Sequence, residues 1–222
     1  IALSCICSIF GFAKDKTELE VNYGIERDIS RVENTIGRLN WYKEQGYNTS
    51  SIRLPGGLSE NSTQEEIAIA VQAEYTETEY ENFKAFINKK WEEFSGKFEE
   101  LKNVPSFDLM DKYILVLTKY GMGGSYNREK GEIIVNLSGR DKEKIIGTIF
   151  HEIIHLAIEH LIQKHLIKHW YKERLVDLTM NKYFSGMTSN QNIKEDITIV
   201  DEMFNKFFPD FEAITQAIVE NK

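Results

Sequence analysis

The spacing of hydrophobic residues predicts helices in the first hundred residues of the chain. Between residues 14 and 61 the sequence is polar and broken by glycine and proline, so we expect short helices and loops there. One stretch, 28–41, has apolar residues at every third or fourth position, as in an amphipathic helix. A second helix is expected to begin at Ser62 or Thr63, because acidic residues and then an apolar run follow at once.

A longer helix is predicted over 77–102, where large apolar side chains form a stripe. The stripe consists of Tyr80, Phe83, Phe86, Ile87, Trp91, Phe94 and Phe98. Such a stripe is more often a face packed on a core than the lining of a ligand groove, so we expect packing. Residues 14–105 are therefore predicted to form a mostly helical N-terminal region.

After Pro105 the pattern changes to short runs rich in β-branched residues, and 113–118 and 131–137 are predicted to be strands. The glycine-rich segment 121–127 between them lacks the Lys-Ser/Thr ending of a phosphate-binding loop, so we expect a flexible rim over a cleft. Ser138 to Asp141 then resemble a capping box before a helix that is apolar on most of its circumference. This pattern predicts an α+β fold, with a small antiparallel or mixed sheet packed on a buried helix in a core region over 106–222.

Composition and charge exclude several classes of protein. The chain has 222 residues, of which 41% are hydrophobic, and a formal net charge of -8. These values are near the average for globular domains, so a disordered chain or a coiled-coil rod is excluded. The acidic balance provides no overall attraction to phosphate backbones, so we expect no nucleic-acid partner.

The first thirteen residues carry no charge and precede Lys14, which is the pattern of the end of a secretory signal peptide. The segment is too short to span a bilayer. We expect a signal-peptide remnant over 1–13, with the true start of the chain before Ile1, and export to the periplasm or the extracellular space without a stable membrane span. Both cysteines, Cys5 and Cys7, lie in this segment. Lipid anchoring at Cys5 is an alternative that matches the sequence less well.

Within the predicted buried helix, His151-Glu152-Ile153-Ile154-His155 has the H-E-x-x-H pattern. Two histidines four residues apart lie about 40° apart around a helix and about 6 Å apart along it, so both can reach one zinc ion. Glu152 directly follows the first of them and is placed to act as a general base on a metal-bound water. Buried polar side chains in an apolar helix also need a partner, and a metal ion provides one.

With this motif the chain resembles the zincin metallopeptidases. The resemblance implies a zincin-like fold, one Zn²⁺ ion and a peptide or protein substrate held by an antiparallel edge strand that precedes the active-site helix. Residues 131–137 are expected to be that strand, because they lie directly before the helix.

The third metal ligand decides the branch of the zincins. Metzincins carry a histidine six residues after the second ligand, where this chain has Leu161. His160 lies on another side of the helix and His165 lies roughly 15 Å further along it, so neither is expected to reach the ion.

The segment Glu173-Arg174-Leu175-Val176-Asp177 resembles the Glu-x-x-x-Asp segment of the gluzincins, the thermolysin-like branch. That resemblance implies Glu173 as the third ligand, returned to the metal by a second helix. It also implies that Asp177 braces a ligand histidine from the second shell.

The resemblance also implies a Tyr or His donor that stabilises the oxyanion formed on the scissile carbonyl. His169, Tyr171, Tyr183 and Tyr126 are the candidates, and the sequence does not choose among them. His169 is also an alternative to Glu173 as a ligand.

Three functions remain open on this evidence. The leading prediction is a zinc peptidase that uses Glu152 as its general base. The alternatives are a zincin-like domain that binds peptides or surface partners without cleaving them, and a structural zinc site closed by a fourth ligand such as His169.

Overall fold

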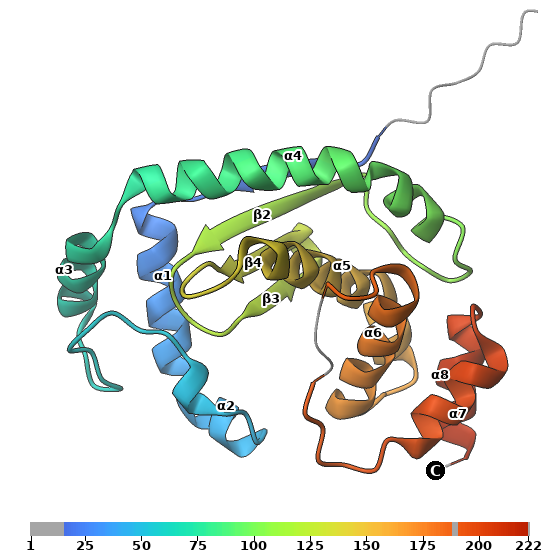
Figure 1. Cartoon of the computed structure of the whole chain (residues 1–222). Coiled ribbons are helices and arrows are strands. Elements are labelled where there is room, and N and C mark those ends of the chain that lie inside the picture. The colour runs from blue at the N-terminus through green and yellow to red at the C-terminus, as the bar shows by residue number, and fades with distance from the viewer. Residues whose placement is uncertain (1–15, 188–190, 222) are drawn as a thin grey trace, which may run out of the picture.

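A computed structural model describes residues 16–187 and 191–221 of the chain (Figure 1). The predicted signal-peptide remnant over 1–13, with Cys5 and Cys7, lies outside the described residues. The strands are β1 (Glu18–Asn22), β2 (Lys112–Thr118), β3 (Gly124–Asn127) and β4 (Glu132–Asn136). The α-helices are α1 (Ile25–Gly37), α2 (Leu39–Glu44), α3 (Gln64–Glu74), α4 (Glu77–Leu101), α5 (Lys142–Lys164), α6 (His169–Tyr183), α7 (Thr198–Phe207) and α8 (Phe211–Glu220).

The four strands form one mixed sheet in the order β1-β2-β4-β3. The pairs β1–β2 and β2–β4 are parallel, whereas β3 runs antiparallel to β4. In the register, Val21 lies opposite Leu115, and Tyr126 lies opposite Ile133. The predicted α+β class and mixed sheet are therefore confirmed. Because β1 pairs with β2, the sheet joins the predicted N-terminal region to the predicted core region.

The sheet differs from the prediction in two places. Residues 18–22, expected among helices and loops, form β1, which pairs along its whole length with β2. The glycine-rich segment was expected to be a flexible rim, but its second half is β3, the edge strand. Consequently 131–137 is not the edge strand: β4 has a neighbour on each side, and its residues Ile133 and Val135 are fully buried.

Most of the predicted helices are present, with altered boundaries. The helix expected over 28–41 is interrupted at Arg38 and becomes α1 and α2. Thr63 caps α3, and its side chain and that of Glu66 form the reciprocal capping box. The start of α5 differs from the prediction, because Asp141 caps the helix by accepting a hydrogen bond from the Glu143 amide. The Ser138 hydroxyl instead donates to the Lys119 carbonyl.

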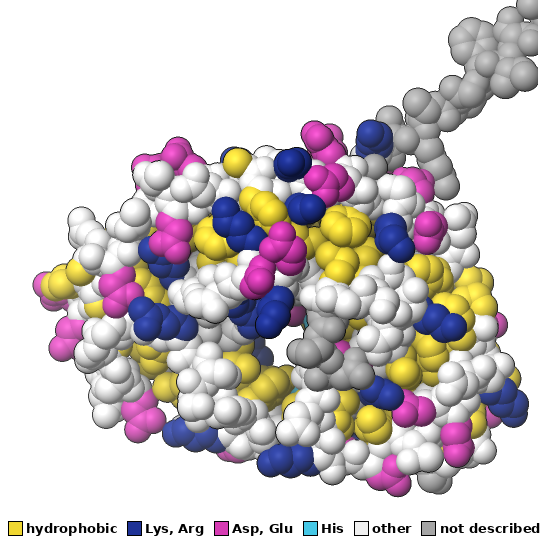
Figure 2. Space-filling model, in the orientation of Figure 1, with side chains coloured by type: hydrophobic (Ala, Val, Ile, Leu, Met, Phe, Trp, Pro, Cys, Tyr) yellow, Lys and Arg dark blue, Asp and Glu magenta, His cyan; other side chains and the backbone are white. Residues whose placement is uncertain are grey.

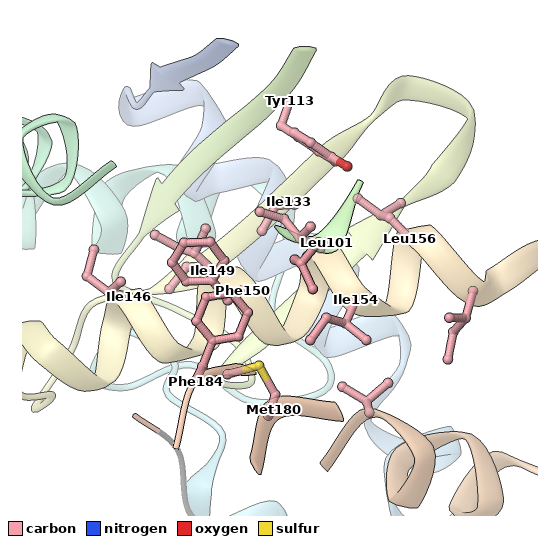
Figure 3. Close-up of a cluster of buried hydrophobic side chains, with 14 of the residues drawn as sticks. Leu101, Tyr113, Ile133, Ile146, Ile149, Phe150, Ile154, Leu156, Met180 and Phe184 are labelled. Carbon is pink, nitrogen blue, oxygen red and sulfur yellow. The ribbon is translucent and has the colours of Figure 1, made fainter. Parts of the chain in front are cut away.

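The main hydrophobic core surrounds α5. In Figure 3, Ile146, Ile149 and Phe150 of this helix lie with Phe184, which follows α6. The Phe150 and Phe184 rings stack with centroids 4.2 Å apart. The ring of Trp91 in α4 also stacks with Phe150, with centroids 5.9 Å apart. The aromatic stripe of α4 therefore packs on the core, as predicted.

By length and hydropathy α5 also qualifies as a candidate membrane span, with 78% of the relevant window buried inside the protein. The apolar surface of α5 packs against the sheet, α4 and α6. The same burial fixes the orientation of the polar side chains that it carries.

Candidate active site

Three side chains from α5 and α6 converge on one point. His155 Nε2 lies 3.0 Å from His151 Nε2, and the Glu173 carboxylate oxygen Oε2 lies 3.6 Å from His151 Nε2 and 3.3 Å from His155 Nε2. His155 and Glu173 are buried, and the His151 side chain is 12% exposed. The three residues predicted as metal ligands are therefore brought together by the fold.

The spacing of these three atoms fits a tetrahedral zinc ion. Bonds of about 2.0–2.1 Å in a tetrahedron place neighbouring ligand atoms about 3.3 Å apart, and the observed separations lie on either side of that value. Two imidazoles and one carboxylate are also a donor set that zinc uses in catalytic sites. The residues therefore fit one zinc ion with a coordination position left for water or substrate.

The turn between α5 and α6 brings Glu173 to the histidines. The helix α5 ends at Lys164, Leu166 adopts a left-handed conformation with φ of 51°, and α6 begins at His169. The chain thereby reverses so that α6 packs along α5.

Burial and mutual charge set the protonation of the cluster. Burial lowers the pKa of His155 to about 4, so this imidazole is neutral at neutral pH. Burial alone would raise the pKa of Glu173, but the adjacent His155 and His151 outweigh it and hold that pKa well below its usual range. A neutral imidazole beside an ionised carboxylate is the protonation state that binds a metal ion.

Glu152 lies next to this cluster in a buried position. Burial, reinforced by the negative charge of Glu173, raises its pKa to about 7, although the nearby His151 opposes the shift. Its carboxylate approaches the backbone of β3 at Gly124, where a Cβ atom would overlap Glu152 Oε1 and lie 2.7 Å from Thr148 Cγ2. Gly124 therefore leaves the space that the Glu152 carboxylate occupies.

Gln191 links Glu173 to Asp177 through two hydrogen bonds. Gln191 Nε2 donates to Glu173 Oε2 at 2.5 Å, and the Gln191 backbone amide donates to Asp177 Oδ2 at 2.8 Å. Asp177 is 1% exposed and lies within electrostatic range of His151. Its hydrogen bond goes to a backbone amide, so the expectation that it braces an imidazole stays a prediction.

The cluster opens into a cleft of about 800 Å³. Figure 2 shows a hollow in the middle of this face of the molecule. One wall consists of α5 and α6, and β3 contributes Gly124 to Tyr126. The opposite wall consists of Trp41 and Tyr42 of α2 and the following Tyr47.

Of the four predicted oxyanion donors, Tyr126 and His169 are among the described residues that line the cleft, whereas Tyr171 and Tyr183 pack against the main core. Tyr126 stacks on His155 with ring centroids 5.2 Å apart, and its hydroxyl donates to Glu159. His169 Nε2 lies 2.7 Å from the hydroxyl of Tyr47.

His160 and His165 lie away from the cluster, as expected from their helix positions. His165 Nε2 lies 2.8 Å from Glu212 Oε1 of α8. His169, proposed as an alternative ligand, has Nδ1 3.8 Å from Glu173 Oε1 and is not a member of the group of three converging donors. Within the described residues, no fourth donor closes this group as a structural zinc site requires.

The sequence did not indicate Tyr47, Gly124 or Gln191 as parts of the site. Tyr47 follows a short helix in a polar region, and Gln191 lies eighteen positions beyond Glu173 in a stretch without a periodic pattern. Gly124 lies in the glycine-rich segment 121–127. Its contact with Glu152 could not be predicted, because that contact depends on β3 pairing with β4.

Comparisons of the chain with protein-family models, curated proteins and solved structures find no match. The resemblance to zincins therefore depends on the motif, on the Glu173 segment and on the geometry described above.

Proposed function

We propose that the protein is a zinc-dependent peptidase of the gluzincin kind, with zinc held by His151, His155 and Glu173. The observation that supports this most strongly is the spacing of the three donor atoms, which suits a tetrahedral ion, beside a buried glutamate in an open cleft. When bound, zinc supplies Lewis acidity that polarises a peptide carbonyl and lowers the pKa of a water molecule.

Glu152 is the general base in this proposal. Its carboxylate accepts the proton of the attacking water and then transfers that proton to the leaving amine. Burial raises the pKa of this carboxyl group above its usual range in the metal-free site, which favours proton acceptance by the base. The backbone of β3 at Gly124 limits where the carboxylate can lie, so the base is held on the cleft side of α5.

Tyr47 is the proposed oxyanion donor, and His169 is the hydrogen-bond partner of its hydroxyl. The Tyr47 hydroxyl lies 2.7 Å from His169 Nε2, and both side chains line the cleft. Burial and the negative charge of Glu173 raise the pKa of the Tyr47 hydroxyl, so it stays protonated and able to donate. Burial lowers the pKa of His169, which therefore adds no positive charge of its own at neutral pH.

The test is hydrolysis of a broad peptide library by the zinc-loaded protein, followed by mass spectrometry. The wild-type protein is expected to cleave peptides, and Glu152→Gln is expected to keep its zinc and lose about 10²–10⁴-fold in rate. Glu143→Gln is the matched control, because Glu143 lies exposed in the first turn of the same helix.

Cleavage by Glu152→Gln at the wild-type rate would contradict the proposed base. Zinc and peptide binding without any turnover by the wild-type protein would instead support a zincin-like binding domain.

A further inference from the structure

The charges around the cleft have the opposite sign to those of the chain as a whole. Four basic side chains line the cleft: Arg38, Arg140, Lys144 and Lys172. Apart from Glu152 and Glu173 of the candidate centre, the lining has one acidic residue, Asp141, whose carboxylate caps α5. The whole chain carries a net charge of -8. Figure 2 shows Lys and Arg side chains at the rim of the hollow.

These four cations lack a directly paired carboxylate, although Glu152 and Asp141 lie within electrostatic range of three of them. Among the described residues, none of them forms an ion pair with a carboxylate. Arg38 lies over the ring of Trp41 at 4.7 Å, Arg140 Nη1 donates to Thr148 Oγ1 at 3.1 Å, and Lys172 Nζ donates to the Tyr126 hydroxyl at 3.1 Å. Lysines and arginines elsewhere on the surface commonly have acidic partners, as Arg128 does in Asp108 and Arg174 in Asp201.

Arg140 and Lys172 lie on either side of the candidate centre. Thr148, which Arg140 contacts, is one helical turn before Glu152 on the same face of α5. The Arg140 guanidinium also lies against the backbone at Gly123, where a Cβ atom would overlap it. Lys172 directly precedes Glu173 on α6. A peptide lying beside the metal ligands would therefore have a cation close to it in both directions.

A fifth cation, Arg31, strengthens the field from behind β3. Its side chain is buried, and its Nη1 donates to the Ser125 hydroxyl at 3.0 Å, while Nε and Nη2 have no hydrogen-bond partner in the described structure. Ser125 itself lines the cleft. Charges at the low-dielectric wall of a cleft attract ligands of opposite charge and select against ligands of like charge.

We infer that the cleft selects peptides that present carboxylates close to the cleaved bond, as acidic side chains or as a free C-terminus. The identification of the ligand as a substrate rests on the proposed peptidase function, whereas the preference for carboxylates rests on the charges alone. Basic peptides are disfavoured by the same charges.

The test measures binding rather than cleavage, by fluorescence anisotropy of labelled peptides with the zinc-loaded Glu152→Gln protein. One peptide sequence is made with Glu, Gln or Lys at the positions that flank its centre, each with a free or an amidated C-terminus. The Glu peptides are expected to bind about tenfold more tightly than the Gln peptides, and the Lys peptides most weakly. Because the attraction is electrostatic, the Glu–Gln difference should shrink as salt is raised.

Substitutions of the basic residues show which of them cause the preference for Glu peptides. Arg140→Gln/Lys172→Gln is expected to reduce the Glu-over-Gln ratio to about one to three, and Lys144→Gln, which alters an exposed side chain, to reduce it by a smaller factor. Arg27→Gln/Lys206→Gln removes the same charges away from the cleft and should leave the ratio unchanged. Thermal unfolding of each variant shows that it is folded.

The free and amidated arms separate the two sources of carboxylate. Tighter binding of the Glu than of the Gln peptide with an amidated C-terminus assigns the preference to acidic side chains. Tighter binding of the free than of the amidated Gln peptide assigns it to the C-terminus, and either result supports the inference. Equal binding of the Glu and Gln peptides together with equal binding of the free and amidated peptides, or an unchanged preference in Arg140→Gln/Lys172→Gln, would overturn it. Selective binding of Glu peptides by a wild-type protein that cleaves none of them would keep this inference and remove the peptidase proposal.

Discussion

The two walls of the cleft are built in different ways. The wall of α5 and α6 belongs to the main core: Ile153, Ile154 and Val176 are fully buried beside the candidate ligands. The wall of α2 and Tyr47 is held by aromatic contacts at the surface, and Trp41 is 38% exposed. The smaller hydrophobic cluster of Val32, Ile67, Val71 and Tyr120 lies under α1, which leads into this wall.

This difference indicates that the two walls have different roles. Metal ligands must keep their spacing to within a few tenths of an ångström, and a densely packed helix pair provides that constancy. The facing wall has fewer buried apolar contacts, so it opens locally at a lower free energy. The preceding helix α1 also carries the buried side chains of Asp28 and Arg31, and the Arg31 charge acts on Glu152.

The largest expected difference between the walls is in stability. Phe150→Ala removes the ring that stacks on Phe184 and should lower the free energy of unfolding by about 3–5 kcal/mol. Ile67→Ala in the smaller cluster should cost about 2 kcal/mol, because that site has fewer apolar neighbours and collapses more easily. Urea unfolding of both variants measures the two values, and a greater loss for Ile67→Ala would contradict the comparison.

A substitution in the facing wall is expected to lower the catalytic rate without changing zinc binding. If Tyr47 donates to the oxyanion, Tyr47→Phe should lower kcat about 10²–10³-fold and leave the zinc content unchanged. Tyr23→Phe, a tyrosine outside the cleft that stacks on Tyr80, is the control for loss of a hydroxyl. Steady-state kinetics on a cleaved library peptide gives the comparison, and an unchanged kcat would remove Tyr47 from the proposal.

The contact between β3 and α5 sets the position of the base. Gly124→Ala should displace the Glu152 carboxylate and lower kcat about 10²-fold, since a shift of about 1 Å in a catalytic group has an effect of that size. Gly37→Ala is the matched control, because no atom lies within 4 Å of a Cβ atom there. Full activity in Gly124→Ala would show that β3 does not constrain Glu152.

The smallest expected effect concerns Asp28. Burial raises the pKa of its carboxyl group, against the opposing hydrogen bond from Tyr80. A raised pKa in the folded state means that the stability contributed by this group is present below the unfolded pKa and is lost as pH rises through the folded pKa. Asp28→Asn should remove that loss, and unfolding free energies across this pH range measure it. A pH profile identical to that of the wild-type protein would exclude Asp28 as its source.

The difference between the two walls also explains how much of the site the sequence could predict. His151, Glu152 and His155 form a local pattern on a strongly apolar helix, and Glu173 lies at a recognisable distance from them, so the densely packed wall was foreseeable. The structure brings all four together.

The facing wall and the sheet edge were not foreseeable in this way. The strand β1 has charged residues at alternate positions and becomes a strand because β2 offers it a parallel partner. The strand β3 consists of Gly-Ser-Tyr-Asn, a sequence with little β propensity, and is fixed by pairing with β4. Tyr47 reaches His169 across 122 positions of sequence. Contacts of this kind depend on the tertiary fold and leave no periodic pattern in the chain.

The proposed binding of one zinc ion by His151, His155 and Glu173 can be measured by elemental mass spectrometry of the purified protein, beside Glu173→Ala and the control Glu212→Ala. We expect one zinc per chain in the wild-type protein and in Glu212→Ala, and a marked loss in Glu173→Ala. A wild-type protein that binds no zinc even after zinc is added, or a Glu173→Ala variant that keeps a full equivalent, would contradict it.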